Sequence, residues 1–286
     1  MAEKILVTGA TGKVGRELVR RLVERRVEVK AATRQPERAT GAFNRSVELV
    51  ELDYVRTETY DAAVQWADRI FLTPPPFDPR ADEDLVPFLD WAVSAGTQHL
   101  VLLSAMGADR LERLALRKVE KRVQRTGADW TILRPNWYMQ NFESGFIAEE
   151  IERDGAFTLS AGAGEVSFVD VRDVADIATA TLTSDDHLGR AYTLTGPEAL
   201  DHGGAAALLS ASSGREIRYV AISDDAMRER LGAEGWPDDQ VEVLVGLLRS
   251  IREGERAAIS PDVERVLGRP PRAFAAYARE QAKAWR

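Results

Sequence analysis

Three glycines near the start of the chain have the spacing of a phosphate-binding loop. Gly9, Gly12 and Gly15 lie between an apolar run at residues 5–7 and a helical stripe that begins at Val14. In such a unit the first glycine makes the tight turn, the second lets the backbone approach a pyrophosphate, and the third allows close packing of helix on strand. The helix start adds unpaired N–H groups and a partial positive charge. The stretch predicts a dinucleotide site, with a purely structural turn as the alternative.

Arg34 indicates which dinucleotide binds. It follows the next predicted strand, at residues 27–33. A carboxylate at this position bonds the free ribose hydroxyl of NAD, whereas an arginine can hold the extra phosphate of NADP. We therefore predict NADP(H) as the cofactor. Lys13, inside the glycine loop, and Arg38 are expected to add positive charge near the same phosphate, and a solvated surface role is the alternative for all three cations.

Other polar residues follow the ends of later predicted strands, which is where a doubly wound sheet binds its ligands. Asp53 and Tyr54 end the strand at residues 47–53 and are expected beside the adenine, although Asp53 could instead cap the following helix. Ser104 ends the strand at residues 99–104 and is expected to bond the cofactor or a substrate carbonyl. The remaining expected cofactor contacts are Thr11, Val14, Thr73, Pro74 and Asn136.

Large apolar side chains near the same strand ends are candidates for a flat substrate pocket. Trp137 and Tyr138 come just past a predicted strand at residues 128–135, and Phe77 follows three prolines that form a stiff segment. The expected substrate contacts are Met106, Trp137, Phe142 and Phe77, and Tyr138 is the candidate proton donor. Core packing is the alternative for these side chains.

The order of the predicted elements defines the fold class. Apolar runs at residues 5–7, 27–33, 47–53, 69–73, 99–104 and 128–135 alternate with helical segments. This alternation predicts a Rossmann-type α/β fold, a doubly wound parallel sheet with helices on both faces. Beyond these segments, the alternation of strands and helices becomes less regular. We expect an NADP(H)-binding domain at residues 1–150, to which residues 169–195 return, and a smaller substrate-binding domain at residues 151–286.

Composition restricts the class of partner. The 286 residues carry a formal net charge of -8, which disfavours nucleic acid or an anionic membrane as a partner. The chain has no cysteine for a disulfide, a thiolate nucleophile or a cysteine metal site, and its three histidines lack metal-ligand spacing. No stretch approaches the ~18 apolar residues of a membrane span, and no signal peptide is evident. We expect a cytoplasmic protein with a small-molecule substrate, and leave its oligomeric state open.

Several segments together carry a family resemblance. The chain resembles the NmrA-like, atypical branch of the short-chain dehydrogenase/reductase superfamily. The segments that support it are Val7–Gly15, Arg34, Asp53–Tyr54, Gly127–Asn141 with Trp130–Asn136 inside it, Val169–Ala175 and Val266–Phe274. The resemblance implies an NADP(H)-dependent oxidoreductase, and it includes reductases of quinones, iminium ions, azo dyes and conjugated cations.

The chain departs from that superfamily in its proton-transfer residues. Ordinary members use a tyrosine four residues before a lysine that lowers the tyrosine pKa. No tyrosine in this chain has a lysine four residues further on. The family's spacing to Glu120 puts Leu116 at the position of the lysine. Lys118 is two residues away and lies on another face of the helix. We therefore expect hydride transfer to a substrate that is already electron-poor, such as a quinone, imine or iminium, azo or conjugated compound. The alternatives are a regulator that senses NADP(H) without turnover, and an isomerase or cyclase.

Overall fold

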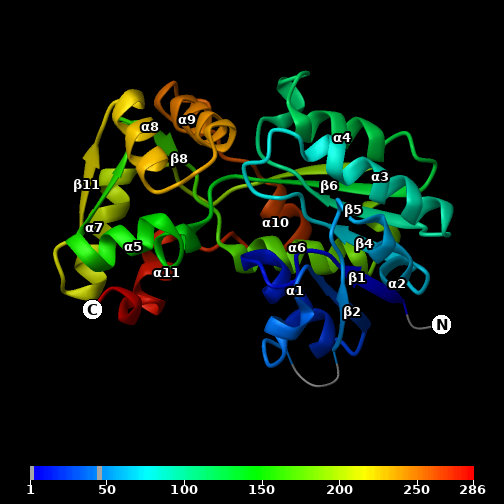
Figure 1. Ribbon diagram of the computed structural model, residues 1–286. Coiled ribbons are helices and arrows are strands. Elements are labelled where there is room, and N and C mark those ends of the chain that lie inside the picture. The colour runs from blue at the N-terminus through cyan, green and yellow to red at the C-terminus, as the bar shows by residue number, and fades with distance from the viewer. Residues whose placement is uncertain (1–2, 44–46) are drawn as a thin grey trace. The chain divides into compact units, whose positions relative to one another are not determined.

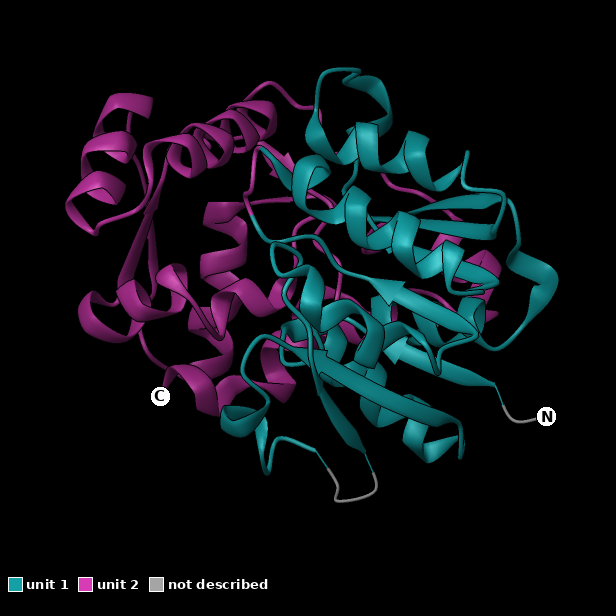
Figure 2. Ribbon diagram, turned by 45° about the vertical axis from the view of Figure 1, so that its right-hand side comes forward, with its two compact units in different colours: residues 1–76, 80–134, 174–193 teal, residues 77–79, 135–173, 194–286 magenta. Residues whose placement is uncertain are grey.

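The computed structural model describes residues 3–43 and 47–286, and the chain divides into two compact units. Unit 1 consists of residues 1–76, 80–134 and 174–193, and unit 2 of residues 77–79, 135–173 and 194–286 (Figure 2). The predicted boundary at residue 150, read as a boundary between functional domains, stays a prediction.

A seven-stranded sheet of order β3-β2-β1-β4-β5-β6-β9 forms the centre of unit 1 (Figure 1). The chain winds from β1 toward β3 on one side and from β4 toward β9 on the other, and neighbouring strands from β3 to β6 pair in parallel. The strands are β1 (Lys4–Val7), β2 (Glu28–Thr33), β3 (Glu48–Glu51), β4 (Arg69–Leu72), β5 (His99–Leu103), β6 (Asp129–Pro135) and β9 (Arg190–Leu194). The prediction of a Rossmann-type doubly wound parallel sheet is confirmed.

Helices cover both faces of this sheet, which explains why its strands are apolar throughout. Leu6, Leu72 and Leu102 pack in a core with α2, α3 and α4. On the other face, α1 and α6 are joined by an ion pair between Arg21 and Asp176. Figure 1 shows α3 and α4 on the side of the sheet opposite α1 and α6. The helices are α1 (Lys13–Glu24), α2 (Tyr60–Val64), α3 (Ala81–Ser94), α4 (Ala115–Val123) and α6 (Val171–Leu182), with short 3-10 turns η1 (Pro36–Ala39), η2 (Thr57–Thr59), η3 (Ala108–Arg110) and η5 (Asp185–His187).

Unit 2 is built from helices around two small sheets. Strand β7 (Ala156–Leu159) pairs in parallel with β11 (Arg218–Ala221), and β8 (Glu165–Val166) pairs antiparallel with β10 (Leu200–Asp201). The helices are α5 (Phe146–Asp154), α7 (His202–Ser213), α8 (Asp224–Ala233), α9 (Asp238–Arg252), α10 (Asp262–Leu267) and α11 (Phe274–Glu280), with 3-10 turns η4 (Met139–Phe142) and η6 (Ala282–Trp285).

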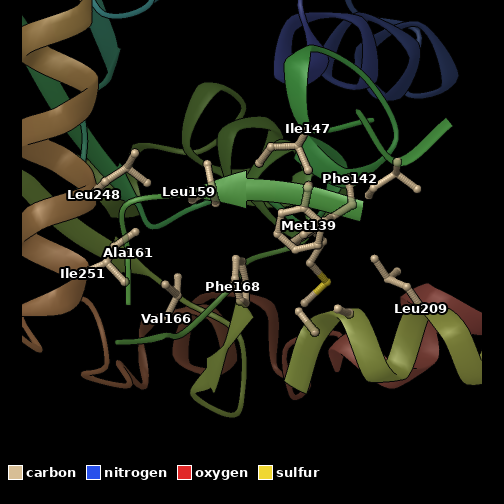
Figure 3. Close-up of a cluster of buried hydrophobic side chains, with 14 of the residues drawn as sticks. Met139, Phe142, Ile147, Leu159, Ala161, Val166, Phe168, Leu209, Leu248 and Ile251 are labelled. Atoms are coloured by element: carbon tan, nitrogen blue, oxygen red, sulfur yellow. The ribbon is translucent and has the colours of Figure 1, made fainter. Parts of the chain in front are cut away.

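A buried cluster of aliphatic and aromatic side chains holds unit 2 together. Figure 3 shows Met139 and Phe142 in the space between β7 and α7, which carries Leu209.

Candidate functional site

The glycine loop between β1 and α1 leaves no room for side chains at its turn. Gly9 has φ +58°, and a Cβ there would lie 3.0 Å from Thr73 Cβ. A Cβ on Gly15 would lie 2.3 Å from the carbonyl oxygen of Gly9, so only glycine lets α1 begin this close to the loop. Gly12 precedes α1, which has no side-chain cap. The loop therefore has the shape and the uncapped helix start of a phosphate cradle. Thr11, Lys13 and Val14 belong to the same stretch, and Thr11 is exposed.

Thr73 follows β4 and lies beside the glycine loop. Its N–H donates to Thr8 Oγ1 (2.8 Å), and its carbonyl oxygen lies 3.2 Å from the Tyr54 hydroxyl. The Thr73 hydroxyl itself is buried and has no hydrogen-bond partner among the described residues. A buried hydroxyl without a partner costs free energy unless a ligand completes it. Together with the glycine turn and the uncapped start of α1, this orphan hydroxyl fits a bound dinucleotide. Pro74, the next residue, is half-buried.

Tyr54 braces the ends of two strands. Its hydroxyl lies 2.8 Å from Thr8 Oγ1, and the Thr8 hydroxyl donates to Phe71 O (2.9 Å). Burial raises the Tyr54 pKa, so its phenol stays protonated. Asp53 Oδ1 accepts a hydrogen bond from Val55 N (3.3 Å), a local turn of the kind expected from a capping aspartate. An adenine contact for Asp53 stays a prediction.

Arg34 is an exposed cation close to the cradle. The N–H of Ala10 in the glycine loop donates to Ala32 O (3.1 Å), two residues before Arg34. Within residues 3–43 and 47–286, the Arg34 guanidinium has no carboxylate partner, and neither has that of Arg38. A phosphate can therefore bind to Arg34 without displacing an existing ion pair. The phosphate role stays a prediction.

Ser104 directly follows β5 and takes part in a buried charge network that the sequence analysis missed. Its hydroxyl donates to Glu120 Oε1 (2.7 Å), and Arg134 donates two hydrogen bonds to the same carboxylate (2.8 and 2.9 Å). Arg117 Nη1 donates a fourth hydrogen bond, to Glu120 Oε2 (3.0 Å). Burial by itself would raise the Glu120 pKa, but the hydrogen bonds from Arg134 and Ser104 outweigh it and lower that pKa. A clue in the sequence was an acid beside Val119, on the inner face of an amphipathic helix.

The described residues contain no tyrosine activated by a lysine. The Lys118 ammonium pairs with Asp82 Oδ2 (2.8 Å) and its side chain is 53% exposed. The Tyr138 hydroxyl has no hydrogen-bond partner in the described part of the chain, and burial raises its pKa. A phenol with a raised pKa and no cation beside it is a poor proton donor. A catalytic role for Tyr138 stays a prediction.

Asn136 belongs to unit 2, where its amide nitrogen donates to Ser167 Oγ (2.9 Å) and to Arg256 O (2.8 Å). Its backbone N–H donates to Leu194 O (2.9 Å). The amide group therefore holds three segments of unit 2 together. Its predicted contact with the cofactor stays a prediction.

The predicted substrate residues differ in burial. Phe142 is 1% exposed and packs edge-on against three other phenylalanine rings, which favours the core alternative. Met106, in unit 1, is buried as well. Trp137 and Phe77 are half-buried in unit 2, at the edge of its core. The side chains of Trp137 and Phe77 are thus less fully enclosed in core packing, and a substrate contact for any of the four residues stays a prediction.

Phe77 belongs to an aromatic group that the sequence analysis did not find. Its ring centroid lies 5.9 Å from that of Trp236, which lies 5.8 Å from that of Phe146. Phe77 has φ +56°, a left-handed backbone that costs a residue with a Cβ roughly 1–2 kcal/mol. Strain of this kind occurs often at binding sites. The three residues are far apart in the sequence, and no local pattern joins them.

The described residues contain no group of three or more His, Cys, Asp or Glu that could hold a metal ion. None of their helices has the length and apolar composition needed to cross a membrane.

The fold, the glycine loop and the orphan hydroxyl define a dinucleotide-binding α/β protein. Comparison with known proteins identifies its family. A family described as NAD(P)H-binding matches residues 9–185. The chain is 33% identical over 285 residues to the NAD(P)H azoreductase of Xenophilus azovorans, with 98% of this chain and 99% of that protein covered. It is 36% identical over 287 residues to the (4-alkanoyl-5-oxo-2,5-dihydrofuran-3-yl)methyl phosphate reductase of Streptomyces griseus subsp. griseus, with 98% and 99% covered. The triphenylmethane reductase of Citrobacter sp., solved with NADP(H), has a TM-score of 0.82 at 23% identity, with 98% and 99% covered.

The chain belongs to the NAD(P)H-binding family. It is an NADP(H)-dependent oxidoreductase, as predicted, and the resemblance to the NmrA-like group is confirmed.

Proposed function

We propose that this protein is an NADPH-dependent reductase that transfers hydride to a small, electron-poor substrate without a tyrosine and lysine pair. The proposed substrate is a quinone, an imine or iminium ion, an azo compound or a conjugated double bond. The observation that carries the proposal is the contrast between two parts of the structure. The glycine loop and the unpaired Thr73 hydroxyl fit a dinucleotide cradle, whereas no ammonium group of the described residues is bonded to Tyr54 or Tyr138 to lower its pKa.

Such a site is suited to acceptors that need little help from a proton donor. NADPH, when bound, supplies the hydride. The residues of the chain then have to hold the cofactor, orient an acceptor and exclude water, and orientation alone can lower a barrier by several kcal/mol. The half-buried aromatic group of Phe77, Phe146 and Trp236, whose rings are tilted or edge-on to one another, is the apolar surface that we propose for an acceptor.

The relatives support this substrate class. The azoreductase acts, by its name, on azo compounds, and the Streptomyces enzyme on an acylated dihydrofuranone that carries a phosphate. Both names describe an unsaturated, electron-poor acceptor. We infer the same class for this chain.

The test is to mix the protein with NADPH and a panel of quinones, cyclic imines, azo dyes and conjugated ketones, and to follow the absorbance of the reduced nicotinamide. We expect at least one class to accelerate NADPH oxidation well above the reaction without protein. The Arg34→Ala variant should lower that rate at a limiting NADPH concentration, and Arg25→Ala, an exposed arginine just after α1, serves as its control. Tight NADPH binding without oxidation by any acceptor would instead favour a protein that senses NADP(H).

A further inference from the structure

The single hydrogen of the Ser104 hydroxyl is donated to the Glu120 carboxylate. The Glu120 side chain is 0% exposed, and its two oxygens accept one hydrogen bond from Ser104, two from Arg134 and one from Arg117. An ionised carboxylate has no hydrogen to donate. Ser104 must therefore be the donor in its 2.7 Å hydrogen bond with Glu120.

Ser104 can therefore interact with a ligand only as a hydrogen-bond acceptor, through the lone pairs of its Oγ. Its backbone N–H is bonded to Leu133 O (2.7 Å), and no group among the described residues donates to its Oγ. The residue keeps 6% of its surface exposed. A hydroxyl that donates to a carboxylate becomes a stronger acceptor, because hydrogen bonds in a chain polarise one another.

Ser104 also lies on the side of the sheet where the reacting end of a dinucleotide belongs. Leu102 is paired with Leu72, so Ser104 is level with Pro74 at the carboxyl edge of the sheet. Strand β5 is two strands from β1, which is about 10 Å. Arg34 follows β2, on the opposite side of β1. If Arg34 marks the adenosine end, Ser104 lies toward the other end.

We propose that Ser104 is a hydrogen-bond acceptor for an N–H group at the reacting end of the site, with Glu120, Arg134 and Arg117 as the positioning residues that impose this polarity. The N–H donor is either the carboxamide of the nicotinamide or a protonated imine substrate. A carbonyl or quinone oxygen is disfavoured there, because two oxygens without a hydrogen between them repel. This inference rests on the proposed reductase function, and it replaces the expectation that Ser104 bonds a substrate carbonyl.

The Ser104→Ala variant separates the two sources of the N–H group. Its affinities for NADP+ and for the 3-acetylpyridine analogue, whose methyl ketone replaces the carboxamide N–H2, are measured by calorimetric titration. If the carboxamide is the donor, wild type prefers NADP+ about tenfold and Ser104→Ala reduces that preference below about twofold. If the substrate is the donor, cofactor affinities are unchanged, and kcat/KM for a protonated cyclic imine falls about tenfold or more relative to a quinone. Ser94→Ala, on the exposed end of α3, is the control.

A second variant reverses the direction of the hydrogen bond between residue 120 and Ser104 without removing Ser104. The Gln side chain of Glu120→Gln can donate to Ser104 Oγ, which frees the serine hydrogen for an outside acceptor. We expect its preference to shift toward the 3-acetylpyridine analogue or toward quinones, with Lys118→Ala as the control on the same helix. If Glu120→Gln does not fold, the Ser104→Ala measurements decide alone.

The inference is wrong if Ser104→Ala impairs quinone reduction more than imine reduction, or if neither cofactor preference nor substrate preference depends on Ser104. The titrations need no turnover. A protein that binds NADP+ with a Ser104-dependent preference and reduces no acceptor would contradict the proposed function and still support Ser104 as an acceptor.

Discussion

At the scale of single residues, the charged groups of unit 1 differ in whether they already have partners. Glu120 accepts four hydrogen bonds, and Lys118 is paired with Asp82. Arg34 is exposed and has no carboxylate partner in the described part of the chain. A paired charge mainly positions its neighbours, whereas a free one is available to a ligand.

Replacing Arg34 with alanine should therefore weaken NADPH binding and leave NADH binding nearly unchanged. The reason is that NADPH loses a charge-assisted contact to its extra phosphate, which is worth about 1.5–3 kcal/mol, or roughly 10- to 100-fold in affinity. Fluorescence titration of both cofactors checks it, with Arg25→Ala as the control. Equal losses for NADPH and NADH would exclude the phosphate role.

Tyr138→Phe should change turnover little. Burial raises the pKa of this phenol, and its hydroxyl has no hydrogen-bond partner among the residues described. Loss of a general acid usually lowers a rate by 10²- to 10⁴-fold. We expect kcat to fall by less than about threefold, with the same pH profile as wild type. A fall of tenfold or more, together with a lost limb of the pH profile, would identify Tyr138 as the proton donor.

At the scale of elements, local and long-range features of the site differ in how far the sequence predicts them. The unit from β1 to α1 could be predicted because its glycines, apolar run and helix stripe are neighbours in the chain. The network of Ser104, Glu120 and Arg134 could not, because it depends on β5, α4 and β6 meeting in space. The aromatic group of Phe77, Phe146 and Trp236 was missed for the same reason. Strands as short as β8 and β10 depend on their pairing and carry no pattern of their own.

Two substitutions in the glycine loop should have different effects. In Gly15→Ala the Cβ would lie 2.3 Å from Gly9 O and 2.8 Å from Ala10 Cα, so the backbone must move. We expect a loss of about 2 kcal/mol or more in the free energy of unfolding. In Gly12→Ala the nearest atom, Gly9 O, is 3.2 Å away, so the loss should be smaller and the main effect a weaker affinity for NADPH.

Urea unfolding and NADPH titration together separate these outcomes. Gly246→Ala is the control, because this glycine lies in α9 with nothing within 4 Å of a Cβ. It should stabilise the protein by about 0.5–1 kcal/mol without affecting the cofactor. If Gly15→Ala unfolds like wild type, the close approach of α1 to the loop is not required for stability.

At the scale of the whole molecule, each unit contains a buried histidine whose surroundings favour the neutral ring. In unit 1, the Thr131 hydroxyl donates to His187 O (2.9 Å), so Thr131 accepts from His99 Nε2 (3.1 Å), which makes Nε2 the protonated nitrogen. In unit 2, both ring nitrogens of His202 are buried without a partner among the described residues, and aromatic rings surround them. Burial lowers the pKa of His99 and of His202 from about 6.5 to about 4.

These lowered pKa values make stability depend on pH with a defined sign. Between about pH 6.5 and pH 4, His99 and His202 bind protons in the unfolded chain but stay neutral in the folded protein. Acidification therefore favours unfolding. The stability contribution of each neutral histidine is complete above about pH 6.5 and is lost as the pH falls toward 4. The loss is at most about 3.4 kcal/mol per histidine, since the shift of about 2.5 pKa units corresponds to about 1.36 kcal/mol per unit. We expect the urea midpoint to fall clearly between about pH 7.5 and pH 5.

His202→Leu isolates the share of this loss that arises in unit 2. At pH 7.5 the variant should be about as stable as wild type or more stable, because it removes two buried polar atoms that have no partner. At about pH 5 it should be more stable than wild type by about 2 kcal/mol, because leucine cannot bind a proton and about 1.5 pH units of the titration have then been traversed. The difference between the two pH values removes any constant packing effect of the substitution. If the variant loses as much stability on acidification as wild type does, then His202 does not titrate in this range, and His99 and the carboxylates account for the acid sensitivity.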